Sequence, residues 1–136
     1  MGDTAHYSDS KPPAGNSNIW RQVGFGDGWG DNGCEWREGM EVTVFNDGHV
    51  EVYVPWIKDD RSGRVSFEVE IIMLDPLGRR LEPRPGSWEE MFPLFQGMTS
   101  VGHKETITVP FPPRDYITRN LPHAGSFACY RHSNSV

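Results

Sequence analysis

The sequence MEVTVFNDGHVEVYVPW, residues 40–56, carries the clearest structural signal in this chain. Two runs that alternate apolar and polar residues flank Asn46-Asp47-Gly48, a sequence typical of a hairpin turn. A two-residue turn at Asp47-Gly48 would mix charged and apolar side chains on both faces, because it sets Val44 opposite Glu51. A three-residue loop, with Gly48 in the left-handed region, instead gathers six apolar residues on one face. The predicted pairs are Met40 with Val54, Val42 with Val52, Val44 with Val50 and, next to the loop, Phe45 with His49.

The opposite face of this hairpin carries the residues that are candidates for chemistry. Residues i and i+2 of a strand point the same way, so this face receives Glu41, Thr43, Phe45, His49, Glu51 and Tyr53. It is either a solvated strand surface, where alternating polar residues are expected, or the lining of a polar cavity. Two aromatic rings among the carboxylates favour the cavity as a functional hypothesis.

Short strand-like segments with turn signals between them continue along the chain. They lie at residues 19–25, 34–37, 65–74, 79–82, 106–111 and 126–132, with a short strand or an irregular crossing at 115–120. Five glycines within residues 24–33 predict neither a strand nor a helix there. A capping box at Ser87-Trp88-Glu89-Glu90 predicts one short helical turn near residues 88–95, which Pro93 limits in length.

This pattern predicts an all-β fold. A small antiparallel β-barrel is the first choice, and a two-sheet β-sandwich is the alternative. Residues 1–18 are polar and rich in Ser, Pro, Gly and Asn, so we expect a disordered N-terminal arm. Residues 19–136 are expected to form a single antiparallel β domain, which is long enough to bury a core.

The charge of the chain argues against nucleic acid as a partner. There are 19 acidic and 13 basic residues, which give a formal net charge of −6, whereas phosphate binding needs a clustered basic face. The basic cluster of Arg79, Arg80 and Arg84 is expected to be a solvated turn. No apolar run is long enough to span a bilayer, and residues 1–18 hold no apolar signal-peptide core. We therefore expect a soluble protein, cytoplasmic or secreted, with no membrane partner.

Two cysteines, Cys34 and Cys129, leave two alternatives open. A disulfide between them would close a loop of about 95 residues and stabilise the fold by roughly 4 to 5 kcal/mol on the chain-entropy model. Two buried free thiols would have no special role. Neither cysteine has a CxxC partner, so a zinc or redox site is not expected.

A set of aromatic, cysteine and turn residues resembles a family of small bacterial all-β proteins of unassigned function. The residues are Trp20, Cys34 with Trp36, Asp47-Gly48 in the hairpin, and Phe92-Pro93-Leu94 before Gly97-Met98. That family has a Gly-Asp-Cys segment and an Asp-Gly-Thr hairpin, whereas this chain has Asp31-Asn32-Gly33-Cys34 and has His49 after Asp47-Gly48. The resemblance spans residues 20–98 and implies an all-β, barrel-like fold without a particular activity.

The hairpin face supplies four candidate catalytic residues, His49, Glu51, Tyr53 and Glu41. A histidine and carboxylates in an enclosed site can serve as acid and base. A metal site built from His49, Glu51 and His103 lacks the spacing of known metal-ligand motifs, so we predict no metal and no cofactor.

Four aromatic residues are candidates for ligand binding: Phe45, Trp29, Trp56 and Trp88. Aromatic side chains line apolar pockets and stack on sugar rings. Most of the tryptophans lie in or next to predicted loops, where burial in the core is less assured, and this position favours a cavity at the mouth of a barrel.

These observations support functions of three classes. The first is a small-molecule-binding barrel, a cofactor-independent cyclase or isomerase of biosynthesis that positions a small apolar intermediate beside polar groups. The second is a secreted carbohydrate-binding module that uses Trp29 or Trp88 with Asp27 and Asp31. The third is a protein-interaction domain in which every aromatic residue is core. A homodimer is compatible with each of them.

Overall fold

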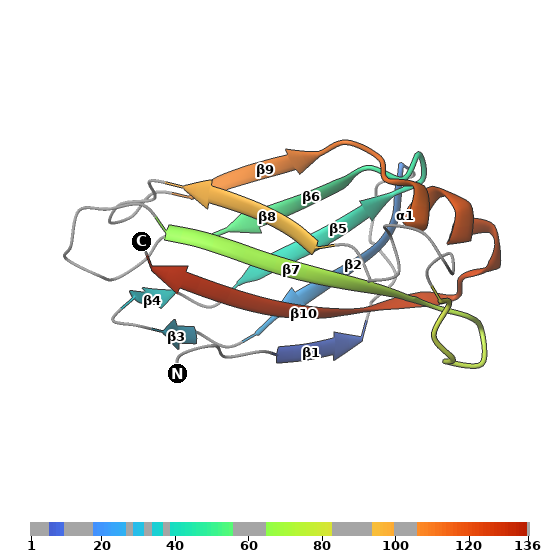
Figure 1. The fold of residues 1–136 in the computed structure, drawn as a ribbon, viewed down its shortest axis with the longest axis horizontal. Helices are drawn as coiled ribbons and strands as arrows, with labels where there is room; N and C mark the ends of the chain where they lie inside the picture. The colour runs from blue at the N-terminus through green and yellow to red at the C-terminus, as the bar shows by residue number, and fades with distance from the viewer. Residues whose placement is uncertain are drawn as a thin grey trace.

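Antiparallel strands make up most of the computed structural model (Figure 1). The structure describes residues 6–9, 18–26, 29–31, 34–36, 39–55, 65–82, 94–99 and 106–135. In residues 6–9, 29–31, 34–36, 65–67, 96–99 and 131–135, and at Leu94, the description covers the backbone alone.

The described strands form two four-stranded sheets and one small hairpin. Sheet A has the order β1-β10-β7-β8, and its strands are β1 (His6–Asp9), β10 (Ser126–Ser135), β7 (Val65–Leu74) and β8 (Leu94–Thr99). Sheet B has the order β2-β5-β6-β9, and its strands are β2 (Ile19–Phe25), β5 (Met40–Phe45), β6 (Val50–Val54) and β9 (Ile107–Phe111). The separate hairpin consists of β3 (Trp29–Asp31) and β4 (Cys34–Trp36).

The predicted register of the central hairpin is confirmed. Val44 pairs with Val50 and Val42 with Val52 across β5 and β6. The N–H of Phe45 donates to the carbonyl of His49 over 2.9 Å, which closes the loop of residues 46–48. Gly48 has a φ of 94°, in the left-handed region that the three-residue loop requires.

The hydrophobic core lies between the two sheets, because side chains from both of them join one buried cluster. Sheet B contributes the inward-facing residues that the alternation of β2, β5 and β6 predicts, and sheet A contributes those of β7, β8 and β10. The fully buried members with the largest side chains are Phe25, Phe95, Phe127, Met40, Ile71 and Met73.

The described pairings leave each sheet open, so the β-barrel of our first choice is not confirmed. Two facing sheets with a shared core correspond instead to the arrangement of the alternative prediction. Closing a barrel requires strands that pair with both neighbours all the way around. In sheet B, no described pairing joins β2 or β9 to a strand of sheet A.

One short helix, α1 (Asp115–Asn120), replaces the strand or irregular crossing expected at these residues, and the 3-10 turn η1 (Leu121–His123) follows it. Tyr116, Ile117 and Asn120 are buried, and this spacing fits one face of a helix and not the alternation of a strand. Asp115 and Arg119 form an ion pair at i, i+4, with 3.3 Å between Oδ2 and Nε. The prediction for this segment was therefore wrong.

Helix α1 covers one end of the two sheets (Figure 1). The Tyr116 hydroxyl accepts the N–H of Met73 in β7 over 3.0 Å and donates to the carbonyl of Leu81 over 2.5 Å. On the side of sheet B, a Cβ added to Gly48 would lie 2.3 Å from Cγ2 of Thr118. The helix is thus fitted against both sheets.

Three further predictions are corrected by the strands. The helical turn expected near residues 88–95 is wrong for its last two residues, because Leu94 and Phe95 lie in strand β8. Pairing of β8 with β7 buries Phe95 in the core. Residues 88–93 lie outside the described part of the chain. The arm expected at residues 1–18 contains β1, whose backbone pairs with β10. The glycine-rich stretch contains β3, which pairs with β4 from Asp31 and Cys34 outward.

The extent of the predicted domain, residues 19–136, stays a prediction.

Among the described residues, no helix is long and apolar enough to cross a membrane.

Candidate functional site

The outer face of sheet B holds every residue of the hairpin that we selected as a candidate for chemistry. The valines of β5 and β6 point inward, so the residues between them point away from the core. Glu41 lies opposite Tyr53, and Thr43 lies opposite Glu51. The face therefore has the composition predicted from the sequence.

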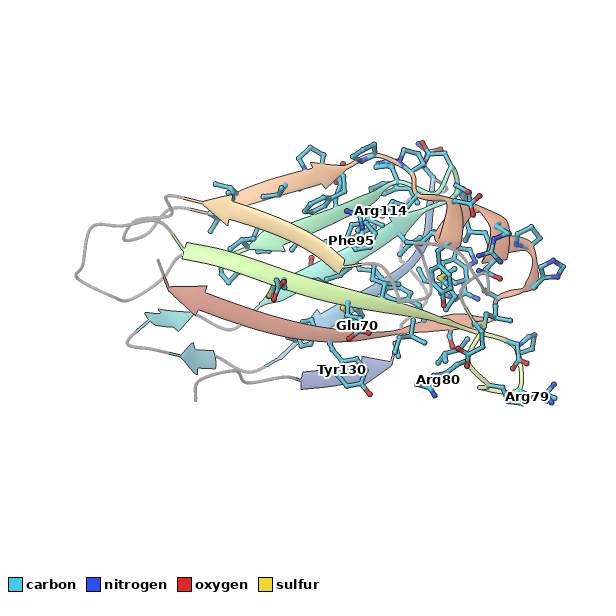
Figure 2. All side chains as sticks on the ribbon, in the orientation of Figure 1. Glu70, Arg79, Arg80, Phe95, Arg114 and Tyr130 are labelled. Carbon is cyan, nitrogen blue, oxygen red and sulfur yellow. The ribbon has the colours of Figure 1, made fainter. Side chains whose placement is uncertain are left out.

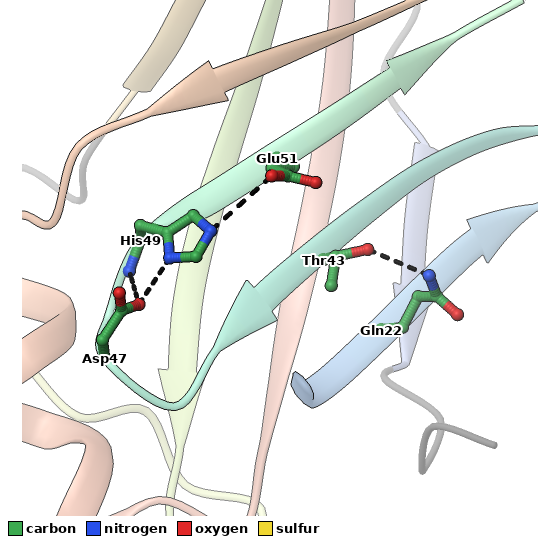
Figure 3. Close-up of polar contacts among 5 residues, drawn as sticks. All are labelled: Gln22, Thr43, Asp47, His49 and Glu51. Carbon is green, nitrogen blue, oxygen red and sulfur yellow. Dashed lines mark hydrogen bonds and ion pairs between the residues drawn. The ribbon is translucent and has the colours of Figure 1, made fainter. Parts of the chain in front are cut away.

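His49 lies between two carboxylates beside the hairpin turn (Figure 3). Its backbone N–H donates to Oδ1 of Asp47 over 2.9 Å, and its ring Nδ1 is within hydrogen-bonding distance of the same oxygen. Its Nε2 lies 3.6 Å from Oε2 of Glu51, a contact of ion-pair range when the ring is protonated. The hydrogen bonds from the backbone and then the ring of His49 hold the pKa of the Asp47 carboxyl below its ordinary value of 3.8.

The His49 ring also stacks on the Phe45 ring. The two centroids are 4.0 Å apart, and the rings are within 9° of parallel. Phe45 and His49 are the residues that close the hairpin loop, so the turn geometry brings the rings together. The Phe45 ring and the Asp47 carboxylate together orient the His49 imidazole.

A row of polar side chains crosses three neighbouring strands of the same face (Figure 3). The amide Nε2 of Gln22 in β2 donates to Oγ1 of Thr43 in β5 over 2.9 Å, and Glu51 of β6 is the next side chain in the row. Thr43 is buried, with 7% of its surface exposed. This hydrogen bond holds the side chains of Gln22 and Thr43 in place on the outer face.

Described residues of this outer face line two hollows. The first has a volume of about 260 Å³ and lies over the middle of the sheet; it is lined by Ile19, Gln22, Glu41, Thr43, Phe45, Glu51, Tyr53 and Thr108. The second has a volume of about 300 Å³ and lies at the hairpin turn; it is lined by Asn18, Phe45, Asn46, Asp47 and His49. We name them the central hollow and the turn hollow.

The four predicted catalytic residues lie together on this face, but they are not enclosed. Tyr53 is 36% exposed, and the side chains of His49 and Glu51 are 28% and 37% exposed. Glu41 is exposed as well. The site that we expected inside a barrel is therefore an open surface on the outside of a sheet. Their catalytic role stays a prediction.

Of the predicted ligand-binding residues, Phe45 lines both hollows. The backbone of Trp29 lies in β3, opposite Trp36. The side chain of Trp29, and Trp56 and Trp88 entirely, lie outside the described residues, so their role in binding stays a prediction.

Sequence reasoning missed the contribution of the neighbouring strands to the central hollow. Gln22 comes from β2 and Thr108 from β9. The alternation of each strand shows which way these side chains point, but the sequence does not reveal that β2 and β9 flank the hairpin. No local signal could have supplied this order, because strand pairing is set by contacts between distant segments.

The cysteines and the basic cluster have no place in this site. Cys129 is buried in the core, and the backbone of Cys34 lies in β4, while the side chain of Cys34 lies outside the described part of the structure, so the disulfide and the free thiols both stay open as alternatives. Arg79 and Arg80 lie exposed at the turn after β7 (Figure 2), as expected of a solvated turn, and Arg79 pairs with Asp75 over 3.1 Å. Arg84 lies outside the described residues. Within the described chain, no group of three or more His, Cys, Asp or Glu side chains is placed to hold a metal ion.

Comparison of the chain with protein-family models, with curated protein sequences and with solved structures finds no match.

Proposed function

We propose that the protein is a carbohydrate-binding module and that the outer face of sheet B is its binding surface. The observation that carries this proposal is the central hollow, in which the rings of Tyr53 and Phe45 lie among hydroxyl, amide and carboxylate groups. Sugars combine flat faces of C–H groups with a rim of hydroxyls. Aromatic rings suit the C–H faces, and polar side chains suit the hydroxyls.

The polar groups of the hollow offer both hydrogen-bond donors and acceptors. Glu41 and Glu51 accept hydrogen bonds, while Gln22, Thr43 and Thr108 can donate and accept. Sugar hydroxyls also do both, so they can satisfy each of these groups. The Gln22–Thr43 hydrogen bond pre-organises part of the surface before a ligand arrives, which lowers the entropy cost of binding.

The volume of the central hollow, about 260 Å³, lies just below the range of pockets that enclose drug-sized ligands, roughly 300 to 1,000 Å³. An open site of this size suits a ligand that stays partly in water. A cyclase or isomerase for an apolar intermediate would need its acid and base in a dry interior. Because the side chains of His49 and Glu51 are partly exposed, we favour sugar binding over a cyclase or isomerase.

Two substitutions in the central hollow test the proposal. The protein is screened on a glycan array of neutral, acidic and amino sugars, and affinities for the soluble forms of the sugars that bind are measured by isothermal titration calorimetry. Tyr53→Ala removes a ring, and Glu51→Gln removes a carboxylate of the hollow. Each is expected to weaken binding at least tenfold, which is about 1.4 kcal/mol, with little loss of thermal stability, because both side chains are partly exposed.

Leu77→Ala is the matched control. Leu77 is 76% exposed and lies in the turn between Asp75 and Gly78, away from both hollows, so its loss should leave affinity unchanged. Absence of binding anywhere on the array would contradict the proposal. Binding that Tyr53→Ala and Glu51→Gln leave intact would also contradict it.

A further inference from the structure

We infer that the central hollow and the turn hollow are two subsites of one groove, and that the groove takes an oligosaccharide chain of several units and not a single sugar. This inference rests on the proposed function. It adds the length and the direction of the ligand to the proposed class.

The two hollows are joined by a shared side chain. Phe45 lines both of them, and it lies at the end of β5, where the hairpin turn begins. Its stacked partner His49 lines the turn hollow, whereas Glu51, two residues along the same strand, lines the central hollow. The hollows therefore follow one another along β5 and β6.

The register of the hairpin sets the length of this groove. Tyr53 lies opposite Glu41 at one end, and Phe45 closes the loop with His49 at the other. Along β5, Glu41 and Phe45 are four residue steps apart, which at about 3.3 Å per step amounts to roughly 13 Å. A single sugar ring is too short to contact the Tyr53 ring and the Phe45–His49 pair together, while a chain of a few units can.

Each subsite has the same pairing of ring and polar groups. Tyr53 is accompanied by Glu41 and Thr108 in the central hollow, and the Phe45–His49 pair is accompanied by Asn18 and Asp47 in the turn hollow. A repeating ligand fits such a surface, because each unit meets aromatic surface and its own set of hydrogen-bonding groups. The hydrogen bonds between Asp47 and His49 hold the ring of the second subsite in place.

A series of ligand lengths tests the inference. Calorimetry is carried out with oligomers of one to six sugar units. Four series are used: β-1,4-linked glucose, β-1,4-linked mannose, β-1,4-linked N-acetylglucosamine and α-1,4-linked glucose. Any other sugar that binds on the array is added as a further series. For a series that binds, affinity should rise at least tenfold from one unit to three or four and then level off.

His49→Ala separates the two subsites. The substitution should lower the affinity for the longer oligomers at least fivefold and change the affinity for the monosaccharide less than twofold, while Tyr53→Ala should weaken both. Leu77→Ala again serves as the control, and thermal melting shows whether each variant is folded.

The outcomes distinguish the inference from the proposed function. Sugar binding with the same affinity at every length, or a loss on His49→Ala that is equal for monosaccharide and oligomer, would overturn the two-subsite groove and leave the carbohydrate-binding module standing. Binding of no sugar in any series or on the array would overturn both.

Discussion

Gly48 shows how much a single residue controls in this fold. It has a φ of 94°, and a Cβ at this position would lie 2.3 Å from Cγ2 of Thr118. Two separate requirements, a left-handed backbone and a close approach of helix α1, therefore exclude a side chain. Gly78 meets only the first requirement, because its φ is 82° and a Cβ there would have no neighbour within 4 Å.

This difference predicts the cost of two alanine substitutions. Gly78→Ala should lower the free energy of unfolding by about 1 kcal/mol, the cost of a left-handed backbone. Gly48→Ala should cost at least about 2 kcal/mol, because overpacking adds to the backbone strain. Adding Thr118→Ser, which removes Cγ2 and keeps the hydroxyl, should recover part of the loss. Urea denaturation measures all of these values, and equal losses for the two glycines would contradict the close approach of α1.

A buried hydroxyl helps to hold helix α1 against β7. The Tyr116 hydroxyl accepts the N–H of Met73 and donates to the carbonyl of Leu81. Burial, as the main cause, raises the pKa of Tyr116 from its ordinary value of 10.0 to about 12. The unfolded chain therefore releases this proton at a lower pH than the folded protein does, and the stability that it contributes is fully present below pH 10 and is lost as the pH rises towards 12.

Tyr116→Phe should consequently have two effects. Near neutral pH it should lower the free energy of unfolding by about 1 to 3 kcal/mol, because the buried N–H of Met73 loses its partner. Between about pH 10 and 12, the stability of the parent protein should fall more steeply than that of the variant, since only the parent carries this titrating group. Denaturation curves at a series of pH values test both effects, and parallel profiles would show that the hydroxyl is not buried as described.

The elements differ in how far their own sequence predicts them. The strand register of the β5–β6 hairpin was predicted correctly. The turn sequence and the alternation of apolar and polar residues are both satisfied only when Val44 pairs with Val50. Helix α1 was missed because Pro112 and Pro113 precede it and six residues are too few for a clear period. The β3–β4 hairpin was missed because the many glycines of residues 24–33 were interpreted as excluding a strand. The dipeptide Asn32-Gly33, which favours two-residue hairpin turns, was given less weight.

For the whole molecule, the sequence predicted the faces of the strands but not the order in which they pair. Alternation placed Glu41, His49, Glu51 and Tyr53 on one face, and the structure confirms this. Alternation does not show whether that face lines an interior or lies on the outside. This depends on whether a second sheet covers that face or covers the valines on the other face. Sheet A covers them, so the candidate site is an outer surface that β2 and β9 widen with Gln22 and Thr108.

Solution NMR shows most directly whether this outer face of sheet B binds sugar. A ¹⁵N-labelled sample is titrated with the oligosaccharide that binds most tightly, and the changes in amide chemical shift are mapped onto the strands. We expect the largest changes on residues 41–45 and 49–53 and on Gln22 and Thr108, and little change in β7 and β10. Changes concentrated in sheet A, or no change with any sugar, would contradict it.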